Sequence, residues 1–295
     1  MLTDSDRKPE PIWWTIIRLL RWDKPAGRLI LMIPALWAVF LAARGKPDPL
    51  LVGVIVLGSL VTSAAGCIVN DLWDRNIDPQ VQRTRNRPLA SRALTLRVGI
   101  GIAGVAFLCA WGLALFLKPL SYWLCVAAVP VIICYPLAKR VFPIPQLVLS
   151  IAWGFAVLIS WSAVTNSLEF ATWLLWAATV LWTLGFDTAY AIADRADDRR
   201  IGVRSSALFF GRRVAEAIGL FFLGTALFLA YVGVVMKLNY GFWIALGLAF
   251  SAWGWQYRSL SQVHAPEFTY PAVFRQNVWI GFGLLAGMLV GLYIQ

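Results

Sequence analysis

The sequence has few acidic residues and few charges of any kind. Only 15 of its 295 residues are Asp or Glu, and charged residues make up 14% of the chain, whereas soluble domains average about 25%. Hydrophobic residues account for 60%, and 16 tryptophans accompany 17 phenylalanines. This composition excludes a cytosolic enzyme, a disordered chain and a nucleic-acid-binding protein whose net charge of +11 lies on a solvated patch.

Cysteine is scarce as well, and its positions argue against two further classes. The four cysteines lie inside apolar stretches, without a CxxC motif or a Cys/His cluster: Cys67, Cys109, Cys125 and Cys134. A disulfide framework and a zinc site are therefore not expected. The polar, proline-containing first residues do not resemble a signal peptide, so we expect the first hydrophobic segment to remain as a membrane span.

Long apolar runs dominate the rest of the chain. A helix needs about 20 apolar residues to cross the hydrocarbon core of a membrane. The sequence predicts nine such spans, at residues 25–43, 50–69, 98–117, 119–138, 144–164, 170–190, 214–236, 239–255 and 277–294. We therefore predict an all-α, polytopic membrane protein in which a short segment, 1–24, precedes a single transmembrane domain, 25–295.

Two local patterns add detail to these spans. Prolines in the fourth and fifth spans predict kinks or a short break between them: Pro130, Pro136, Pro143 and Pro145. The last span repeats glycine every fourth residue, at Gly283, Gly287 and Gly291, which predicts a surface for close packing of a neighbouring helix.

The basic residues are divided unevenly between the connections. Twenty-two of the 26 Lys and Arg lie before or at the start of the first span or in every second connection after it, and the remaining four are Arg44, Lys46, Lys118 and Lys237. Because basic loops stay in the cytoplasm, this distribution puts the N-terminus and the loops at 70–97 and 191–213 there. The predicted location is a bacterial-type inner (plasma) membrane, with the C-terminus outside.

The acidic residues gather at the cytoplasmic ends of two predicted spans. One group contains Asn70, Asp71, Asp74 and Asp78, and the other contains Asp187, Asp194 and Asp198. If each helix continues past the membrane edge, a turn of about 100° per residue aligns most of each group along one face. Carboxylates stacked in this way repel one another and are costly near lipid.

A bound divalent cation would relieve this repulsion. Oxygen ligands without His or Cys favour Mg²⁺, which leaves coordination positions open for phosphate oxygens. The alternative is a solvated acidic loop paired with its neighbouring arginines. Arg83 and Arg87 follow the first group and Arg204 follows the second, and guanidinium groups suit a diphosphate, although the topology alone explains many of these charges. An apolar cavity beneath such a head group implies a ligand with a long lipid tail.

Several motifs resemble those of the UbiA superfamily of intramembrane prenyltransferases. The pattern NDxxDxxxD at 70–78, followed by RTxxRPL at 83–89, is similar to the first signature of that superfamily. The stretch at 187–207 resembles the second signature, and Tyr135 with Lys139 matches the YxxxK element. The segments RWDKPAG and AGC, which begin at Arg21 and Ala65, resemble the 4-hydroxybenzoate polyprenyltransferase branch.

The resemblance implies a fold and an activity. It implies a bundle of nine helices around a central cavity, capped by cytoplasmic loops and open sideways to the lipid bilayer. It also implies Mg²⁺ as cofactor, as two ions, and polyprenyl diphosphate and 4-hydroxybenzoate as substrates. The prenyl group would be transferred to the ring carbon ortho to the hydroxyl, with release of diphosphate, in ubiquinone or plastoquinone biosynthesis; no nucleic acid takes part.

Individual roles follow from the motifs and from the resemblance. The predicted metal ligands are Asn70, Asp71, Asp74, Asp78, Asp194 and Asp198. Asp74 and Asp194 are also predicted as catalytic, together with Asp187, which would orient the phenol or accept a proton, unless it makes only a helix-packing hydrogen bond. The predicted substrate-binding residues are Arg21, Lys24, Arg75, Arg83, Arg87, Tyr135, Lys139, Arg140, Tyr190 and Arg204.

Within this set, Lys139 is predicted to hold diphosphate and Arg140 to hold the benzoate carboxylate. His264 lies in a predicted loop and is not expected to act as a base. Two alternatives stay open. The same fold could take another acceptor, such as homogentisate, a naphthoate, chlorophyllide or haem. A transporter would need charged residues near the middle of spans and repeated halves, which nine spans with acids at their ends do not favour.

Overall fold

The computed structural model describes residues 10–262, 266 and 268–293, and this part of the chain contains helices and no strands. Residues 1–9 of the predicted N-terminal segment, His264 and the last residue of the predicted final span lie outside the described residues. The α-helices are α1 (Ile12–Leu19), α2 (Ala26–Ala42), α3 (Pro49–Trp73), α4 (Leu96–Ala114), α5 (Pro119–Cys134), α6 (Ala138–Val141), α7 (Pro145–Thr165), α8 (Phe170–Ala191), α9 (Arg195–Ile201), α10 (Ser206–Phe210), α11 (Val214–Val235), α12 (Tyr240–Leu260) and α13 (Thr269–Tyr293). The 3₁₀ helices are η2 (Asp78–Gln80), η3 (Tyr135–Leu137), η4 (Ile192–Asp194) and η5 (Gly211–Arg213).

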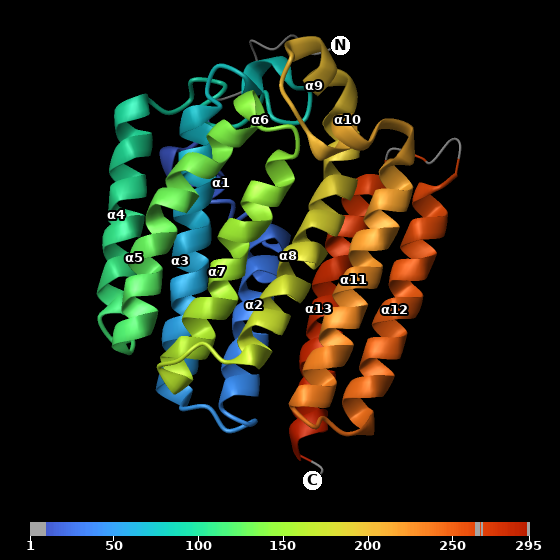
Figure 1. The fold of residues 1–295 in the computed structure, drawn as a ribbon. Coiled ribbons are helices and arrows are strands. Elements are labelled where there is room, and N and C mark those ends of the chain that lie inside the picture. The colour runs from blue at the N-terminus through green and yellow to red at the C-terminus, as the bar shows by residue number, and fades with distance from the viewer. Residues whose placement is uncertain (1–9, 263–265, 267, 294–295) are drawn as a thin grey trace.

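The long helices run side by side as one bundle, and the short helices α6, α9 and α10 lie together at one end of it (Figure 1). Within the described ranges, seven helices are long and apolar enough to cross a membrane, and α2 is a shorter apolar helix. α12, with 21 residues, is as long as several of these but less apolar. Each of the nine predicted spans coincides with one long helix, so the predicted all-α, polytopic membrane class is confirmed.

Proline sets the boundary between the fourth and fifth spans, as predicted. α5 contains Pro130 and ends at Cys134, and the next turn, η3, contains Pro136. The short α6 follows, and α7 begins at Pro145, a position where the missing N–H of proline costs no helical hydrogen bond. This interruption turns the chain over the end of the bundle.

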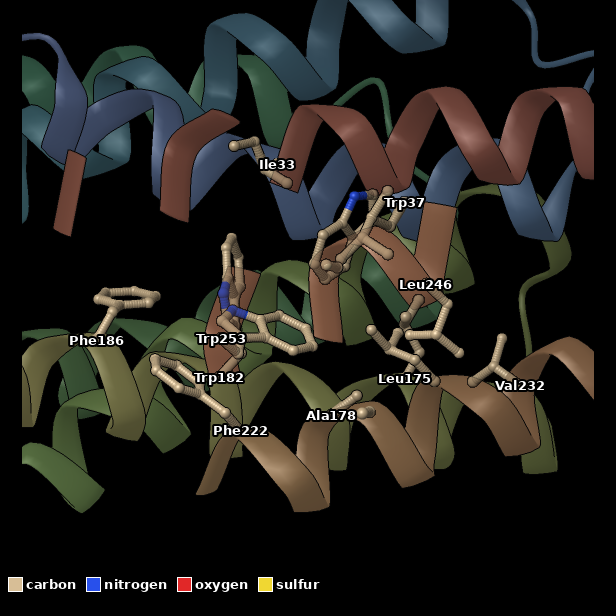
Figure 2. Packing of buried hydrophobic residues seen from close by; sticks show 14 of the residues in the cluster. Ile33, Trp37, Leu175, Ala178, Trp182, Phe186, Phe222, Val232, Leu246 and Trp253 are labelled. Atoms are coloured by element: carbon tan, nitrogen blue, oxygen red, sulfur yellow. The ribbon is translucent and has the colours of Figure 1, made fainter. Parts of the chain in front are cut away.

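The helices α2, α8, α11, α12 and α13 share the largest hydrophobic core. Figure 2 shows Trp182 of α8 beside Trp253 of α12, with Phe222 of α11 next to them. Both indole N–H groups donate to the side-chain oxygen of the buried Asn277, at 2.7 and 2.9 Å. Phe222 stacks on Trp253 with ring centroids 5.5 Å apart. The indole N–H groups of Trp182 and Trp253 are therefore satisfied, whereas the buried Nε1 of Trp161 in the same core has no hydrogen-bond partner. The aromatic rings fill the space between four helices.

Two of the three repeated glycines in α13 form a close contact with α12. A Cβ atom at Gly287 would lie 2.2 Å from the Cβ of Ala245, and one at Gly291 would lie 3.0 Å from the Cβ of Phe242. A Cβ atom at Gly283 would meet nothing within 4 Å. The predicted packing stripe is correct for Gly287 and Gly291 but wrong for Gly283, which is exposed.

The other side of the bundle is hollow. The helices α3, α4, α5 and α7 surround an apolar cavity of about 780 Å³. Small residues such as Gly58 and Gly104 line it, and a Cβ atom at either would meet nothing within 4 Å. A space of this size, walled by apolar side chains, can hold a long hydrocarbon chain.

Candidate active site

A polar cavity of about 290 Å³ lies where the chain caps the bundle. Its walls come from the end of α3, from the loop that follows α3 and from the turns that follow α5 and α8. Five residues line both this cavity and the large apolar one: Cys67, Tyr135, Leu149, Asp187 and Tyr190. The two spaces therefore meet, and a ligand with a charged head and an apolar tail fits across the junction.

The first acidic group does not lie on one continuous helix. α3 ends at Trp73, and Asp74 caps it, its backbone N–H donating to the carbonyl of Asn70. Asp78 stands in η2, because the following Pro79 disfavours the α-helical conformation of the residue before it. The predicted helical alignment of Asn70, Asp74 and Asp78 is thus wrong, yet all three line the same cavity.

The second acidic group lies along one continuous helix that contains a 3₁₀ turn. α8 ends at Ala191, so Asp187 belongs to its last turns, whereas Asp194 lies in η4 and Asp198 in α9. The predicted continuation of the helix past the span is confirmed, because Phe170–Ile201 form one helix of 32 residues, although a 3₁₀ turn at Ile192–Asp194 interrupts its α-helical geometry. The three carboxylates nevertheless line the polar cavity opposite the first group.

Arginines pair with the acids of the first group. Asp71 is 1% exposed and accepts two hydrogen bonds from the Nη2 of Arg21, at 2.6 and 2.9 Å. Arg87 donates to Asp71 at 3.1 Å and to Asp78 at 2.9 Å. Burial alone would lower the pKa of Arg87, but the carboxylates of Asp71 and Asp78 outweigh it and raise that pKa. The backbone of Arg21 has a φ of 57°, a strained conformation for a residue with a side chain, and the ion pair holds it in place.

Two more ion pairs cross the cavity between distant segments. Lys139 of α6 contacts Asp74, and burial raises the pKa of Asp74 while the ammonium group opposes that rise. Arg83 contacts Asp194, donates to the hydroxyl of Tyr190 at 3.1 Å and lies over the Tyr190 ring at 4.6 Å. The cavity therefore contains both basic side chains, which can bind an anion, and carboxylates, which can bind a cation.

The donor set of the cavity suits a hard cation. Its polar lining supplies carboxylate and amide oxygens, and Oδ1 of Asp74 is buried without a hydrogen-bond partner. Among the residues that the structure describes, no three His, Cys, Asp or Glu side chains stand together as a ready metal cluster, because Arg and Lys side chains lie between the carboxylates. The oxygen atoms of this lining fit Mg²⁺ in type, because carboxylate and amide oxygens are ligands that this ion takes.

Most of the predicted site residues meet in the polar cavity, and three do not. Those that line it are Arg21, Asn70, Asp71, Asp74, Asp78, Arg83, Arg87, Tyr135, Lys139, Asp187, Tyr190, Asp194, Asp198 and Arg204. Lys24, Arg75 and Arg140 lie outside both cavity linings. Arg140 is exposed, donates to the carbonyl of Trp73 at 2.7 Å and lies over the Trp73 ring.

Sequence reasoning missed three polar residues of the cavity. Thr84 lines it from the loop after α3, and its hydroxyl donates to the carbonyl of Asp78 at 3.0 Å. Gln146 lines it from the first turn of α7, and its Oε1 accepts a hydrogen bond from the backbone N–H of Ser206 at 2.8 Å. Ser205 lines it from the loop before α10 and caps that helix. A polar side chain directly after Pro145, at the start of an apolar span, was the signal available for Gln146.

The chain was compared with known protein families. The model of the UbiA prenyltransferase family matches residues 31–292. The chain belongs to the UbiA prenyltransferase family. It is therefore an integral membrane protein with prenyltransferase activity, as the resemblance of its motifs implied.

Two relatives illustrate the similarity in sequence. The 4-hydroxybenzoate solanesyltransferase of Synechocystis sp. is 66% identical over 291 residues, which cover 99% of this chain and 99% of that protein. A 4-hydroxybenzoate octaprenyltransferase of Ralstonia nicotianae is 41% identical over 270 residues, which cover 92% of each chain. Both relatives align over nearly their whole length, so the match includes the site as well as the spans.

Solved structures share the fold. A UbiA homolog from Aeropyrum pernix K1 superposes with a TM-score of 0.78 at 22% identity, covering 89% of this chain and 97% of that one. A UbiA homolog from Archaeoglobus fulgidus bound to GPP and Mg²⁺ superposes with a TM-score of 0.69 at 16% identity, covering 92% of this chain and 99% of that one. At this level of identity, the likeness establishes the helical bundle.

Proposed function

We propose that this protein transfers a polyprenyl group from polyprenyl diphosphate to the carbon of 4-hydroxybenzoate ortho to its hydroxyl, for quinone biosynthesis. The observation that carries the proposal is the junction of the two cavities, because a polar space for diphosphate opens into an apolar space of about 780 Å³. The names of the relatives, which cite solanesyl or octaprenyl transfer to 4-hydroxybenzoate, support the same pair of substrates.

The basic side chains of the cavity would hold the diphosphate. Arg87 and Lys139 are already in the polar lining and pair with carboxylates there. A diphosphate competes for these cations, since guanidinium and ammonium groups bind phosphate oxygens through charge-assisted hydrogen bonds. When the allylic C–O bond breaks, the electron pair leaves with the diphosphate, and these cations stabilise the growing negative charge.

The oxygen-bearing residues would hold Mg²⁺, which is the cofactor that we propose. They are Asn70, Asp71, Asp74, Asp78, Asp194 and Asp198, all in the polar lining. When bound, Mg²⁺ would supply charge neutralisation to the diphosphate. Structures of a UbiA homolog from Archaeoglobus fulgidus bound to Mg²⁺ with GPP or with DMAPP support this choice.

The acceptor would lie at the junction of the two cavities. Asp187 and Tyr190 line both spaces and come from the last turns of α8. We assign Asp187 to the phenol, whose hydroxyl it can orient, and to the ring proton that leaves when aromaticity is restored. The apolar walls keep water away from the allylic cation, which water would convert to an alcohol.

Purified protein tests the proposal directly. Incubation with polyprenyl diphosphates of several lengths and with 4-hydroxybenzoate, homogentisate and a naphthoate is expected to give prenylated 4-hydroxybenzoate as the main product by mass analysis. Removal of divalent ions with a chelator should stop diphosphate release, and added Mg²⁺ should restore it. A main product from another acceptor, or full activity in the presence of the chelator, would contradict the proposal.

We further propose that the polar cavity faces the cytoplasm, because the connections on that side carry 22 of the 26 basic residues. Cysteines introduced at Arg85 and at Lys46, in a background without native cysteine, test this orientation. An impermeant thiol reagent should label position 46 in intact cells and position 85 only in inverted vesicles. The reverse pattern would contradict the predicted orientation.

A further inference from the structure

Arg28 is a buried cation that the site described above does not use. It lies in the first turn of α2 and is 2% exposed. Its Nε, Nη1 and Nη2 atoms are all buried, and none makes a hydrogen bond. Buried guanidinium groups in proteins are paired, because leaving such a charge without a partner in a medium of low polarity is costly. This arrangement points to an anion that binds beside Arg28.

The free edge of the guanidinium group favours a carboxylate. The ring of Trp22 lies 4.5 Å from the Cζ of Arg28 and covers one face of the planar group. Stacking uses the face and leaves the N–H groups along the edge free. A carboxylate matches such an edge with two parallel hydrogen bonds. Asp23 and Cys67 are close enough to act on Arg28 electrostatically, but neither is hydrogen-bonded to it.

The large apolar cavity lies close to Arg28, although Arg28 itself is not part of its lining: Cys67, which lines both cavities, is near enough to act on Arg28 electrostatically. Gly27 and Leu31, one before and three after Arg28, line the large apolar cavity. A Cβ atom at Gly27 would meet nothing within 4 Å. Asp187 and Tyr190, at the junction with the polar cavity, line the same space. One cavity therefore borders both Asp187 and the first turns of α2, and an aromatic acceptor in it has access to both.

We propose that Arg28 binds the carboxylate of the aromatic acceptor and selects an acidic acceptor over a neutral one. This inference rests on the proposed function. The diphosphate has its own cations in the polar cavity, and Arg28 does not line that cavity, so Arg28 serves a second anion. Arg140, for which the sequence predicted this role, is exposed and already donates to the carbonyl of Trp73, whereas Arg28 is buried without a hydrogen-bond partner. The carboxylate is para to the hydroxyl, so its binding also sets which ring carbon faces the prenyl donor.

The variant Arg28→Met tests the proposal, with Arg97→Met as its matched control. Arg97 is an exposed arginine in the first turn of α4 and lines neither cavity. Replacing a buried unpaired charge by an apolar side chain of similar length is expected to preserve folding. Each protein is assayed with 4-hydroxybenzoate, with its methyl ester and with a polyprenyl diphosphate, and thermal unfolding is measured with and without 4-hydroxybenzoate.

In Arg28→Met, we expect the KM for 4-hydroxybenzoate to rise roughly 10- to 100-fold, as for a lost charge-assisted hydrogen bond. The KM for the donor should stay within about twofold of the wild-type value, as should every constant of Arg97→Met. The preference for the acid over the ester should fall, and 4-hydroxybenzoate should no longer raise the unfolding temperature. Arg28→Lys keeps the charge but not the two parallel hydrogen bonds, so its KM for 4-hydroxybenzoate should lie between those of the wild-type protein and Arg28→Met.

Other outcomes separate the two proposals. An unchanged KM for 4-hydroxybenzoate in Arg28→Met overturns the role of Arg28 and leaves the proposed function standing. If the wild-type protein uses 4-hydroxybenzoate and its methyl ester equally well, the role of Arg28 is also overturned, and the proposed function still stands. A loss of activity that anionic lipid restores, whatever the acceptor, assigns Arg28 to a lipid phosphate and overturns the inference. Wild-type protein that releases diphosphate but makes no prenylated 4-hydroxybenzoate overturns the proposed function itself.

Discussion

The two sides of the helix bundle differ in how tightly they are packed. The largest hydrophobic core lies among α2, α8, α11, α12 and α13, whereas the apolar cavity of about 780 Å³ lies among α3, α4, α5 and α7. Glycine residues have different surroundings on the two sides. A Cβ atom at Gly185 of α8 would lie 2.6 Å from the Phe222 ring, but one at Gly58 of α3 would meet nothing within 4 Å. One side uses glycine to bring helices together, and the other uses it to leave room.

This difference suits a catalyst that must hold a charged head in fixed geometry and still accept a long flexible chain. α8 belongs to the packed side, and its last turns carry Asp187 and Tyr190 to the junction of the cavities. Site residues that project from a rigid element hold their positions better than residues on a mobile one. The hollow side can then follow the shape of the prenyl chain without disturbing these positions.

The largest expected effect lies where the two sides meet. Asp74→Asn or Asp194→Asn removes a negative charge at almost constant size, and we expect each to lower kcat at least 100-fold while the unfolding temperature changes little. Steady-state kinetics and thermal unfolding of the purified variants measure this. Asp197→Asn is the control, because Asp197 pairs with Arg200 at 2.8 Å and lies outside the polar cavity lining. Activity near the wild-type level in both site variants would remove the metal-binding role.

Filling the hollow side should have an intermediate effect that depends on the donor. Gly58→Leu projects a side chain into the apolar cavity, so long donors should lose roughly 10-fold in kcat/KM while short donors lose little. Gly101→Leu is the control, because a Cβ atom there also meets nothing within 4 Å but Gly101 does not line the cavity. Equal losses for short and long donors would show that the prenyl chain does not follow this space.

The smallest effect should appear on the packed side, in stability and not in specificity. Gly287→Ala introduces a methyl group against Ala245 and is expected to lower the free energy of unfolding by about 1–3 kcal/mol. Gly283→Ala, on the same helix but with nothing within 4 Å, should leave that free energy almost unchanged. Denaturant unfolding in detergent compares the two variants. A larger loss for Gly283→Ala would contradict the packing of α13 on α12.

Much of the fold could be predicted because hydropathy is a local property of the chain. The runs of apolar residues matched nine long helices, and the prolines marked the break between α5 and α7. The ends of helices were less accessible, because 3₁₀ turns at Asp78 and at Asp194 depend on a few backbone angles that the hydrophobic pattern does not record. The predicted continuous helix therefore failed at Asp78, whereas at Asp194 the helix continues through a 3₁₀ turn to Ile201, and the acids of both groups line one cavity.

The amino-acid order by itself determined that this chain is embedded in a membrane. It also placed the few acidic residues beside basic residues at the ends of two spans. Tertiary structure alone decided which charges meet. Arg21 reaches Asp71 across 50 residues of sequence and Arg83 reaches Asp194 across 111, and no local pattern encodes such pairings. It also set Arg28 apart from the arginines that serve topology. The physical reason is that burial and pairing depend on the helices packed around a side chain, whereas hydropathy depends only on its neighbours along the chain.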